Sequence, residues 1–307
     1  SKLSNLRQAL PGEFTRRAFA NEKLDLAEIE GLADLIEAET EAQRVQALQV
    51  LSGKLGKRVE KWRSDIIRAM ALIEVTIDFA DEEVPTDVSN DVILILTNII
   101  NNLEVESEST KIAERVRSGF EVAIVGKPNV GKSSLLNVLS GREAALTSEE
   151  AGTTRDIIEV RMDLGGLPVT IMDTAGLRAT DNLIEHKGIS KAIEKANSAD
   201  LVIALTDDGK TPTEIKNTSM LKFVSKCDDG GLVNGVSAVT GYGLENMISS
   251  IKNTLQKKVQ NQGLATRYRH KEAIDSAVNK IYIAKKFVED GPAFYDLAAE
   301  ELRQTTY

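Results

Sequence analysis

Hydrophobic side chains recur every three or four residues along 18–80, along 91–117 and again after residue 258. This spacing places them on one side of an α-helix. At Ser118-Gly119 the pattern changes to short apolar runs of strand length that alternate with helical stretches. The sequence therefore predicts an α/β domain over 118–258 between two helical segments, 1–117 and 259–307.

The alternation in the central region is typical of an α/β domain with a largely parallel sheet. Each flanking helical segment has an apolar face that needs a partner. We therefore expect the two segments to pack together as one all-α domain into which the α/β domain is inserted, with residues 1–18 either part of it or the tail of a preceding domain. The expected strands are 122–125, 157–163, 168–172, 201–205, 221–225 and 233–236, and the expected helices are 134–139, 184–197 and 243–257.

Composition narrows the class of protein. The 307 residues carry a formal net charge of −9 and one cysteine, Cys227. The chain lacks the excess of Lys and Arg that indicates nucleic-acid binding, and a single thiol cannot form an intrachain disulfide. No run approaches the roughly 18 apolar residues of a membrane span. These features favour a cytoplasmic protein, and because the chain begins at Ser1 and ends in an unfinished helical pattern, we expect a fragment.

The segment 126–133 fits the phosphate-loop pattern G-x-x-x-x-G-K-[ST] between an expected strand and an expected helix. Its glycines let backbone N–H groups turn toward a phosphate, and the helix start adds partial positive charge. Lys132 is expected to reach the β- and γ-phosphates and act in catalysis, and the Ser133 hydroxyl to ligate magnesium. The alternative is a glycine-rich turn before a helix. The nucleotide-binding residues expected here are Asn129, Val130, Gly131, Lys132, Ser133 and Ser134.

Two further loops carry residues that can sense magnesium and the γ-phosphate. Asp173 follows an expected strand and can hold magnesium through water, and the Gly176 N–H can bond the γ-phosphate because glycine permits close approach. Guanine-nucleotide hydrolases place a magnesium-binding threonine in the preceding loop, where Thr153 and Thr154 leave the choice open. We favour Thr154. The alternatives are a β-turn for Asp173 and an ordinary polar loop for the threonines.

A fourth segment, Ser225-Lys226-Cys227-Asp228, is close to the guanine-reading pattern [NT]-K-x-D. The Asp228 carboxylate can accept hydrogen bonds from the N1–H and 2-amino groups of guanine, which adenine cannot offer. Ser225 replaces the usual asparagine, so we expect one bracing hydrogen bond to be weak or lost. Ser237-Ala238 is expected to back the base through a backbone N–H. Together with Lys226, these residues predict a preference for guanine over adenine.

This combination resembles the MnmE (TrmE) family, the GTPases of tRNA wobble-uridine modification. The likeness covers nearly the whole chain and is most specific in P-G-E-F-T at 11–15 and G-T-T-R-D at 152–156. It continues in 23–26, 28–38, 126–133, 141–145 and 173–178. The resemblance implies a Ras-like phosphate-loop GTPase domain inserted into an all-α helical domain.

The resemblance also implies that potassium and dimerisation of the GTPase domains activate hydrolysis, without an arginine from another protein. Glu185, in the twelfth position after Asp173, matches the family glutamate that orients the attacking water through a second water. Ser148 and Glu150 depart from the residues that are commoner in the potassium loop. By the family motif, four residues would hold the potassium ion: Asn129, Ser148, Glu150 and Thr153.

The partners that the family implies are GTP and GDP, a second copy of the chain, the flavoprotein MnmG, and tRNA contacted indirectly or weakly. Most of the family's amino-terminal domain, which binds folate and joins the dimer, and its carboxy-terminal Cys-x-x-x-Lys motif do not occur in this sequence. We therefore expect this chain to hydrolyse GTP without modifying tRNA. Two other hypotheses stay open: a GTP switch that binds ribosomal RNA during ribosome assembly, and a nucleotide-binding scaffold with negligible turnover.

Overall fold

The computed structural model describes residues 7–78, 88–142, 145–146, 159–173, 192–207, 215–260 and 262–306. It divides into two compact units, one helical and one α/β. The helical unit comprises Ser1–Glu37, Val45–Glu114 and Asn261–Tyr307, and the α/β unit comprises Ala38–Arg44 and Arg115–Gln260. An α/β domain inserted into an all-α domain, as expected, is confirmed.

The short segment Ala38–Arg44 belongs to the α/β unit, although its helical pattern favours a place with the flanking helices. Two hydrogen bonds explain the assignment. The Gln43 side-chain amide donates to the Arg117 carbonyl oxygen at 2.8 Å, and the Ala42 N–H donates to the Gly166 carbonyl oxygen at 3.0 Å. Periodicity gives the helix but not the neighbour against which the helix packs.

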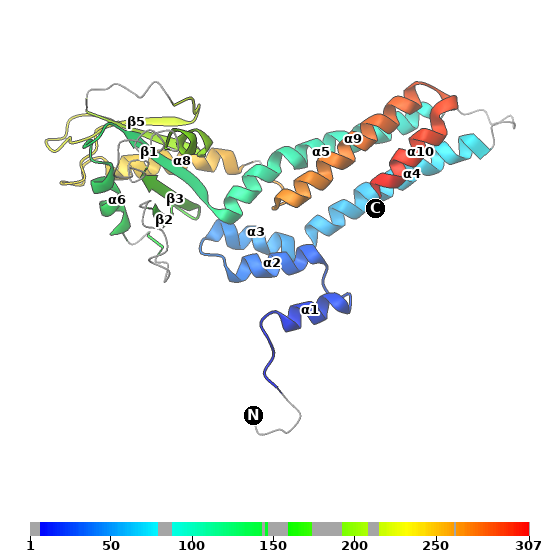
Figure 1. Cartoon of the computed structure of the whole chain (residues 1–307), viewed down its shortest axis with the longest axis horizontal. Coiled ribbons are helices and arrows are strands. Elements are labelled where there is room, and N and C mark those ends of the chain that lie inside the picture. Colours follow the sequence, from blue (N-terminus) through cyan, green and yellow to red (C-terminus); the bar gives the residue numbers. More distant parts are fainter. Residues whose placement is uncertain are drawn as a thin grey trace, which may run out of the picture. The chain divides into compact units, whose positions relative to one another are not determined.

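In the helical unit, four helices lie side by side and share one apolar core (Figure 1). They are α4 (Lys54–Asp78), α5 (Ser89–Ser118), α9 (Tyr268–Glu289) and α10 (Tyr295–Thr305). The two segments that flank the α/β unit in sequence therefore pack together, because burying both apolar faces removes them from water. The smaller elements are α1 (Glu13–Ala20), α2 (Leu26–Ile36), α3 (Glu41–Leu51) and the 3-10 turn η2 (Pro292–Phe294).

A buried carboxylate joins the returning chain to α5. The Glu106 side chain is 3% exposed and accepts hydrogen bonds from the N–H groups of Leu264 and Ala265, at 2.6 and 2.7 Å. Its other oxygen lies 2.6 Å from Nη1 of Arg58. A buried charge is tolerated when it is paired and hydrogen-bonded in this way. Glu106 thus fixes the start of the second helical segment against the first.

The α/β unit contains a five-stranded sheet in the order β2-β3-β1-β4-β5, in which only β2 runs antiparallel to its neighbour. The strands β1 and β4 are central and mostly buried, as the apolar runs 122–125 and 201–205 predict. Two helices, α6 (Lys132–Ser140) and α8 (Leu244–Val259), share the main core of the sheet. The strands are β1 (Phe120–Gly126), β2 (Glu159–Asp163), β3 (Pro168–Asp173), β4 (Leu201–Thr206) and β5 (Met220–Val224).

Two expected elements differ from the structure. The strand expected at 233–236 is wrong: Gly235 makes only an isolated bridge with Val224. The chain forms a turn there, because the Gly235 N–H donates to the Leu232 carbonyl oxygen at 3.0 Å. The pairing with β5 therefore consists of this one bridge. The helix expected at 184–197 lies mostly outside the described residues, and 192–198 are helical.

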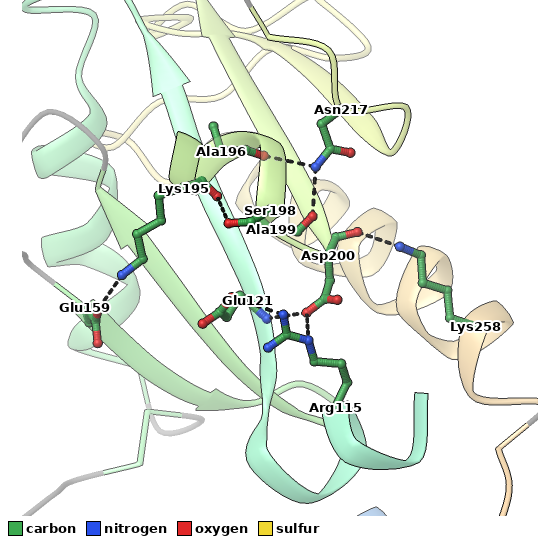
Figure 2. A network of polar contacts seen from close by, with 10 residues as sticks. All are labelled: Arg115, Glu121, Glu159, Lys195, Ala196, Ser198, Ala199, Asp200, Asn217 and Lys258. Carbon is green, nitrogen blue, oxygen red and sulfur yellow. Dashed lines mark hydrogen bonds and ion pairs between the residues drawn. The ribbon is translucent and has the colours of Figure 1, made fainter. Parts of the chain in front are cut away.

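Charged side chains gather at the amino-terminal edge of the sheet (Figure 2). Asp200 precedes β4, and its carboxylate accepts from the Glu121 N–H at 2.9 Å and forms an ion pair with Arg115, whose Nε lies 3.0 Å away. The Lys258 ammonium donates to the Asp200 carbonyl oxygen at 2.5 Å. Asp200 therefore ties the ends of α5 and α8 to the sheet, at the edge opposite the phosphate loop. Within the described part of the chain, no helix has an apolar stretch long enough to cross a bilayer.

Candidate nucleotide site

The expected nucleotide-binding segments converge on the carboxyl-terminal edge of the sheet. The phosphate loop follows β1, Asp173 ends β3, and Ser225 follows β5. The register pairs Ile124 with Asp173 and Gly126 with Leu205, so these strands end at one level. In open α/β sheets, this edge is where ligands bind.

Glycines shape the phosphate loop at both of its ends. A Cβ at Gly126 would lie 2.3 Å from the Leu205 carbonyl oxygen, so only glycine allows β1 and β4 to stay this close there. Gly131, at φ +102°, is the N-cap of α6 and provides no side-chain cap. The first N–H groups of a helix have no partner within the helix. The start of α6 therefore presents backbone N–H groups and partial positive charge to an anion.

The Lys132 side chain lies within this loop and is 5% exposed. Its ammonium donates to the carbonyl oxygens of Gly126 and Lys127, at 2.9 and 2.8 Å. These contacts hold the charge at the start of α6, next to the first N–H groups of the helix. Val130 is buried and anchors the loop in the core, whereas Asn129 and Ser134 are exposed at its surface.

Ser133 and Asp173 come together although they lie 40 residues apart in sequence. The Ser133 hydroxyl donates to a carboxylate oxygen of Asp173 at 2.8 Å, and Asp173 is 1% exposed. A hydroxyl and a carboxylate are oxygen ligands of the kind that Mg²⁺ prefers. The two residues therefore fit the magnesium role that the sequence assigns to them, with Asp173 behind Ser133.

The guanine-reading segment lies at the end of β5. The Ser225 hydroxyl donates to the Thr206 carbonyl oxygen at 3.2 Å, so this serine braces the ends of β4 and β5 to each other. Lys226 adopts a left-handed backbone with φ +59°, and its side chain is exposed, as is Asp228. The Asp228 carboxylate accepts a 2.5 Å hydrogen bond from the hydroxyl of Ser237.

Ser237 makes hydrogen bonds through its hydroxyl and also through its backbone N–H. Its side chain is fully buried, and its Oγ also accepts the N–H groups of Val239 and Thr240, at 3.1 and 3.0 Å. Its own N–H donates to the Tyr242 carbonyl oxygen at 2.9 Å. The Ser237 N–H is therefore engaged within the chain, and the neighbouring Ala238 is half-buried.

Six of the expected site residues lie outside the described residues: Ser148, Glu150, Thr153, Thr154, Gly176 and Glu185. Two contacts at this site were not predicted from the sequence. One is the hydrogen bond from Ser237 to Asp228, and the other is the position of Tyr242 beside the same loop. The pattern S-A after a guanine-reading aspartate marks the first, while nothing in the local sequence signals the second.

Comparisons with known proteins show which family the chain resembles. The profile of the MnmE helical domain matches residues 26–307. The tRNA modification GTPase MnmE of Ruegeria sp. (strain TM1040) is 54% identical over 298 residues, which cover 97% of this chain and 70% of that protein. The protein of the same name from Dinoroseobacter shibae is 53% identical over 307 residues, covering 99% of this chain and 71% of that protein.

Solved structures match at lower similarity. The G domain of the T. maritima FeoB iron transporter is 24% identical, with a TM-score of 0.32. The matched region covers 45% of this chain and 98% of the FeoB chain. A GTP-binding protein from Sulfolobus solfataricus, in complex with GDP, is 16% identical with a TM-score of 0.33. It covers 82% of this chain and 79% of that chain. On the profile match and the identity to curated relatives along almost its whole length, the chain belongs to the MnmE family of tRNA modification GTPases.

Proposed function

We propose that this chain supplies the GTP hydrolysis of tRNA wobble-uridine (U34) C5 modification, activated by potassium and by dimerisation, and acting with a flavoprotein partner. The observation that supports the hydrolytic part is the contact of Ser133 with Asp173 at the start of α6. These two oxygen ligands would suit magnesium, and the amino terminus of the helix would suit a phosphate. Family membership supports the tRNA pathway as its setting.

The chain's own residues bind and orient the triphosphate. The N–H groups at the start of α6 and the Lys132 ammonium stabilise negative charge on the β- and γ-phosphates. Magnesium would be held by Ser133 and Thr154 directly and by Asp173 through water, and when bound it neutralises charge that builds on the phosphates. Gly176 would donate its N–H to the γ-phosphate, and Ser134 would contact the α-phosphate from the helix.

The other end of the nucleotide is read at the loops after β5. Asp228 would accept from the guanine N1–H and 2-amino groups, while Ala238 would donate its N–H to the 6-oxo group. The Lys226 stem would cover the base. The hydroxyl of Ser237 supports this arrangement, because it occupies one carboxylate oxygen of Asp228 from behind and thereby limits how the carboxylate turns.

Potassium activation would use oxygen donors on the surface of the phosphate loop. Asn129 is exposed there with a left-handed backbone at φ +60°, and its amide oxygen is a ligand that suits K⁺. The remaining ligands would come from Ser148, Glu150 and Thr153, and Glu185 would orient the attacking water. A cation held by these residues would neutralise the negative charge that builds on the phosphates in the transition state, as an arginine finger does in other GTPases.

Cation replacement tests this proposal. At saturating GTP and magnesium, we expect hydrolysis in potassium to exceed hydrolysis in sodium by about fivefold or more, since a charged group can stabilise a phosphoryl-transfer transition state by at least this factor. The rate per molecule should also rise with protein concentration. Asn129→Ala should remove the potassium effect while GDP still binds. Equal rates in the two salts would contradict activation by potassium, and a rate independent of protein concentration would contradict the role of the dimer.

A further inference from the structure

Asp228 lies in a tight turn whose position depends on the residues after it. The Gly230 N–H bonds the Cys227 carbonyl oxygen at 3.2 Å, which makes Asp228 and Asp229 the central residues of the turn. Gly230 and Gly231 then adopt left-handed backbones, with φ +74° and +92°. Two successive glycines have many accessible conformations, so the segment after Asp228 needs an external support to keep one of them.

Tyr242 provides that support from the segment that leads into α8. Its hydroxyl accepts from the Gly231 N–H at 3.2 Å and donates to the Leu232 carbonyl oxygen at 3.1 Å. Its ring lies against Gly230, where an added Cβ would come within 3.2 Å of the ring atom Cε2. One side chain thus contacts three consecutive residues immediately after the guanine-reading turn.

The backbone of Tyr242 is held by the loop that contains Ser237. The Tyr242 carbonyl oxygen accepts the N–H of Ser237, whose hydroxyl bonds Asp228. Tyr242 also precedes Gly243, the N-cap of α8, where a Cβ would lie 1.9 Å from the Gly235 carbonyl oxygen. Because α8 packs in the core of the sheet, Tyr242 lies directly before the fixed start of that helix.

The geometry points to Tyr242 as a positioning residue that sets guanine specificity by holding the turn of Asp228 in register with Ser237 and Ala238. This inference rests on the proposed reading of guanine by Asp228. Tyr242 does not contact the carboxylate; it acts through the backbone of 230–232. Guanine bonds both oxygens of the Asp228 carboxylate, one through N1–H and one through the 2-amino group. If the turn is displaced, both oxygens can no longer face the base, and we expect the hydrogen bond to the 2-amino group to be lost.

The test compares binding of GDP, inosine diphosphate and ADP by the wild-type chain, Tyr242→Phe and Tyr242→Leu. Inosine diphosphate lacks the 2-amino group, so it reports whether Asp228 uses both oxygens. Removing one hydroxyl that makes two partly exposed hydrogen bonds should weaken GDP binding by about three- to tenfold. Binding of inosine diphosphate should change by less than about twofold, and the loss should fall on KM for GTP rather than on kcat. Tyr242→Leu should show a larger loss of the same kind.

Tyr282→Phe is the matched control, because the Tyr282 hydroxyl also makes a hydrogen bond, to Glu104 at 3.0 Å, but in the helical unit. It should bind all three nucleotides like the wild type. If wild-type protein prefers GDP to inosine diphosphate and Tyr242→Phe keeps that ratio, the positioning role is overturned while the proposed function stands. If wild-type protein does not discriminate GDP from ADP, the proposed function itself fails, and the inference with it.

Discussion

At the scale of single residues, the sequence identifies side chains well and their hydrogen-bond partners poorly. Lys132, Ser133 and Asp173 lie where the phosphate-loop motif and the strand pattern predict, because the first two begin α6 after the loop that follows β1 and Asp173 ends β3. Tyr242 could not be found in this way. Its role depends on how a loop of the guanine-reading segment folds back toward α8, and no local pattern encodes that contact.

Asp228→Asn tests the residue that reads the base. The amide keeps an oxygen for the Ser237 hydroxyl but places an N–H where guanine also presents donors, so one hydrogen bond is lost and two donors face each other. We expect GTP affinity to fall by about 100-fold, the size of a buried polar mismatch, and xanthosine triphosphate, which carries a 2-oxo acceptor, to bind better than GTP. Fluorescence titration measures both. Asp229→Asn, the next residue of the same turn, is the control and should behave as wild type.

At the scale of elements, periodicity predicts the helices and buried strands closely but fails where a glycine turn interrupts an apolar run. The strands expected at 168–172 and 201–205 occur as Pro168–Asp173 and Leu201–Thr206. The segment 233–236 has a valine at each end, yet Gly235 closes a turn with Leu232. Buried charged contacts, such as those of Glu106 and Asp200, also escape prediction from sequence, because their partners lie far away in the chain.

His270, in α9, makes the stability of the helical unit depend on pH. Burial lowers the pKa of its imidazole below 6.5, and the nearby charge of Arg269 adds to this effect, while Glu30, 3.6 Å from Nε2, opposes it. A lowered folded-state pKa means that the histidine's contribution is present above the unfolded pKa of about 6.5 and is lost as pH falls through the folded pKa. Among the described residues, the Nδ1 atom is buried without a hydrogen-bond partner, which agrees with burial as the main cause of the lowered pKa.

His270→Gln should therefore flatten the loss of unfolding free energy between pH 7 and pH 5. The fluorescence of Trp62, the single tryptophan of the chain, reports this because Trp62 lies in the core of the helical unit. Denaturant titrations at the two pH values would measure the difference for wild type and variant. An equal loss in both proteins would show that other groups carry the pH dependence.

The charged contacts at the amino edge of the sheet can be separated by two substitutions. The Asp200 side chain is 10% exposed, and burial raises the pKa of its carboxyl, which the Glu121 N–H and the charge of Arg115 oppose. Arg115→Met leaves this carboxylate without its guanidinium and should cost about 3 kcal/mol. Asp200→Asn removes the buried charge itself and should cost about 1 kcal/mol. Hydrogen exchange of the β1 and β4 amides measures both, and a larger loss for Asp200→Asn would contradict the account.

At the scale of the whole molecule, the chain builds its helical unit from segments on both sides of the α/β unit. The sequence predicts this insertion because each flanking segment has an apolar face that needs a partner. It also predicts a nucleotide site at one edge of the sheet, since β1, β3 and β5 each end in a segment of the motif. The boundary near Ala38–Arg44 was not predictable, because it depends on packing rather than on pattern.

Competition binding tests the central claim most directly, namely that the edge of the sheet binds magnesium with a guanine nucleotide. Fluorescently labelled GTP is titrated with the chain in the presence of magnesium and again with a chelator, followed by unlabelled GTP or ATP. We expect association that depends on magnesium, displacement by GTP, and no displacement by ATP at about 100-fold excess, because adenine offers Asp228 no pair of donors. Association that ignores magnesium, or displacement by ATP as effective as that by GTP, would contradict the claim.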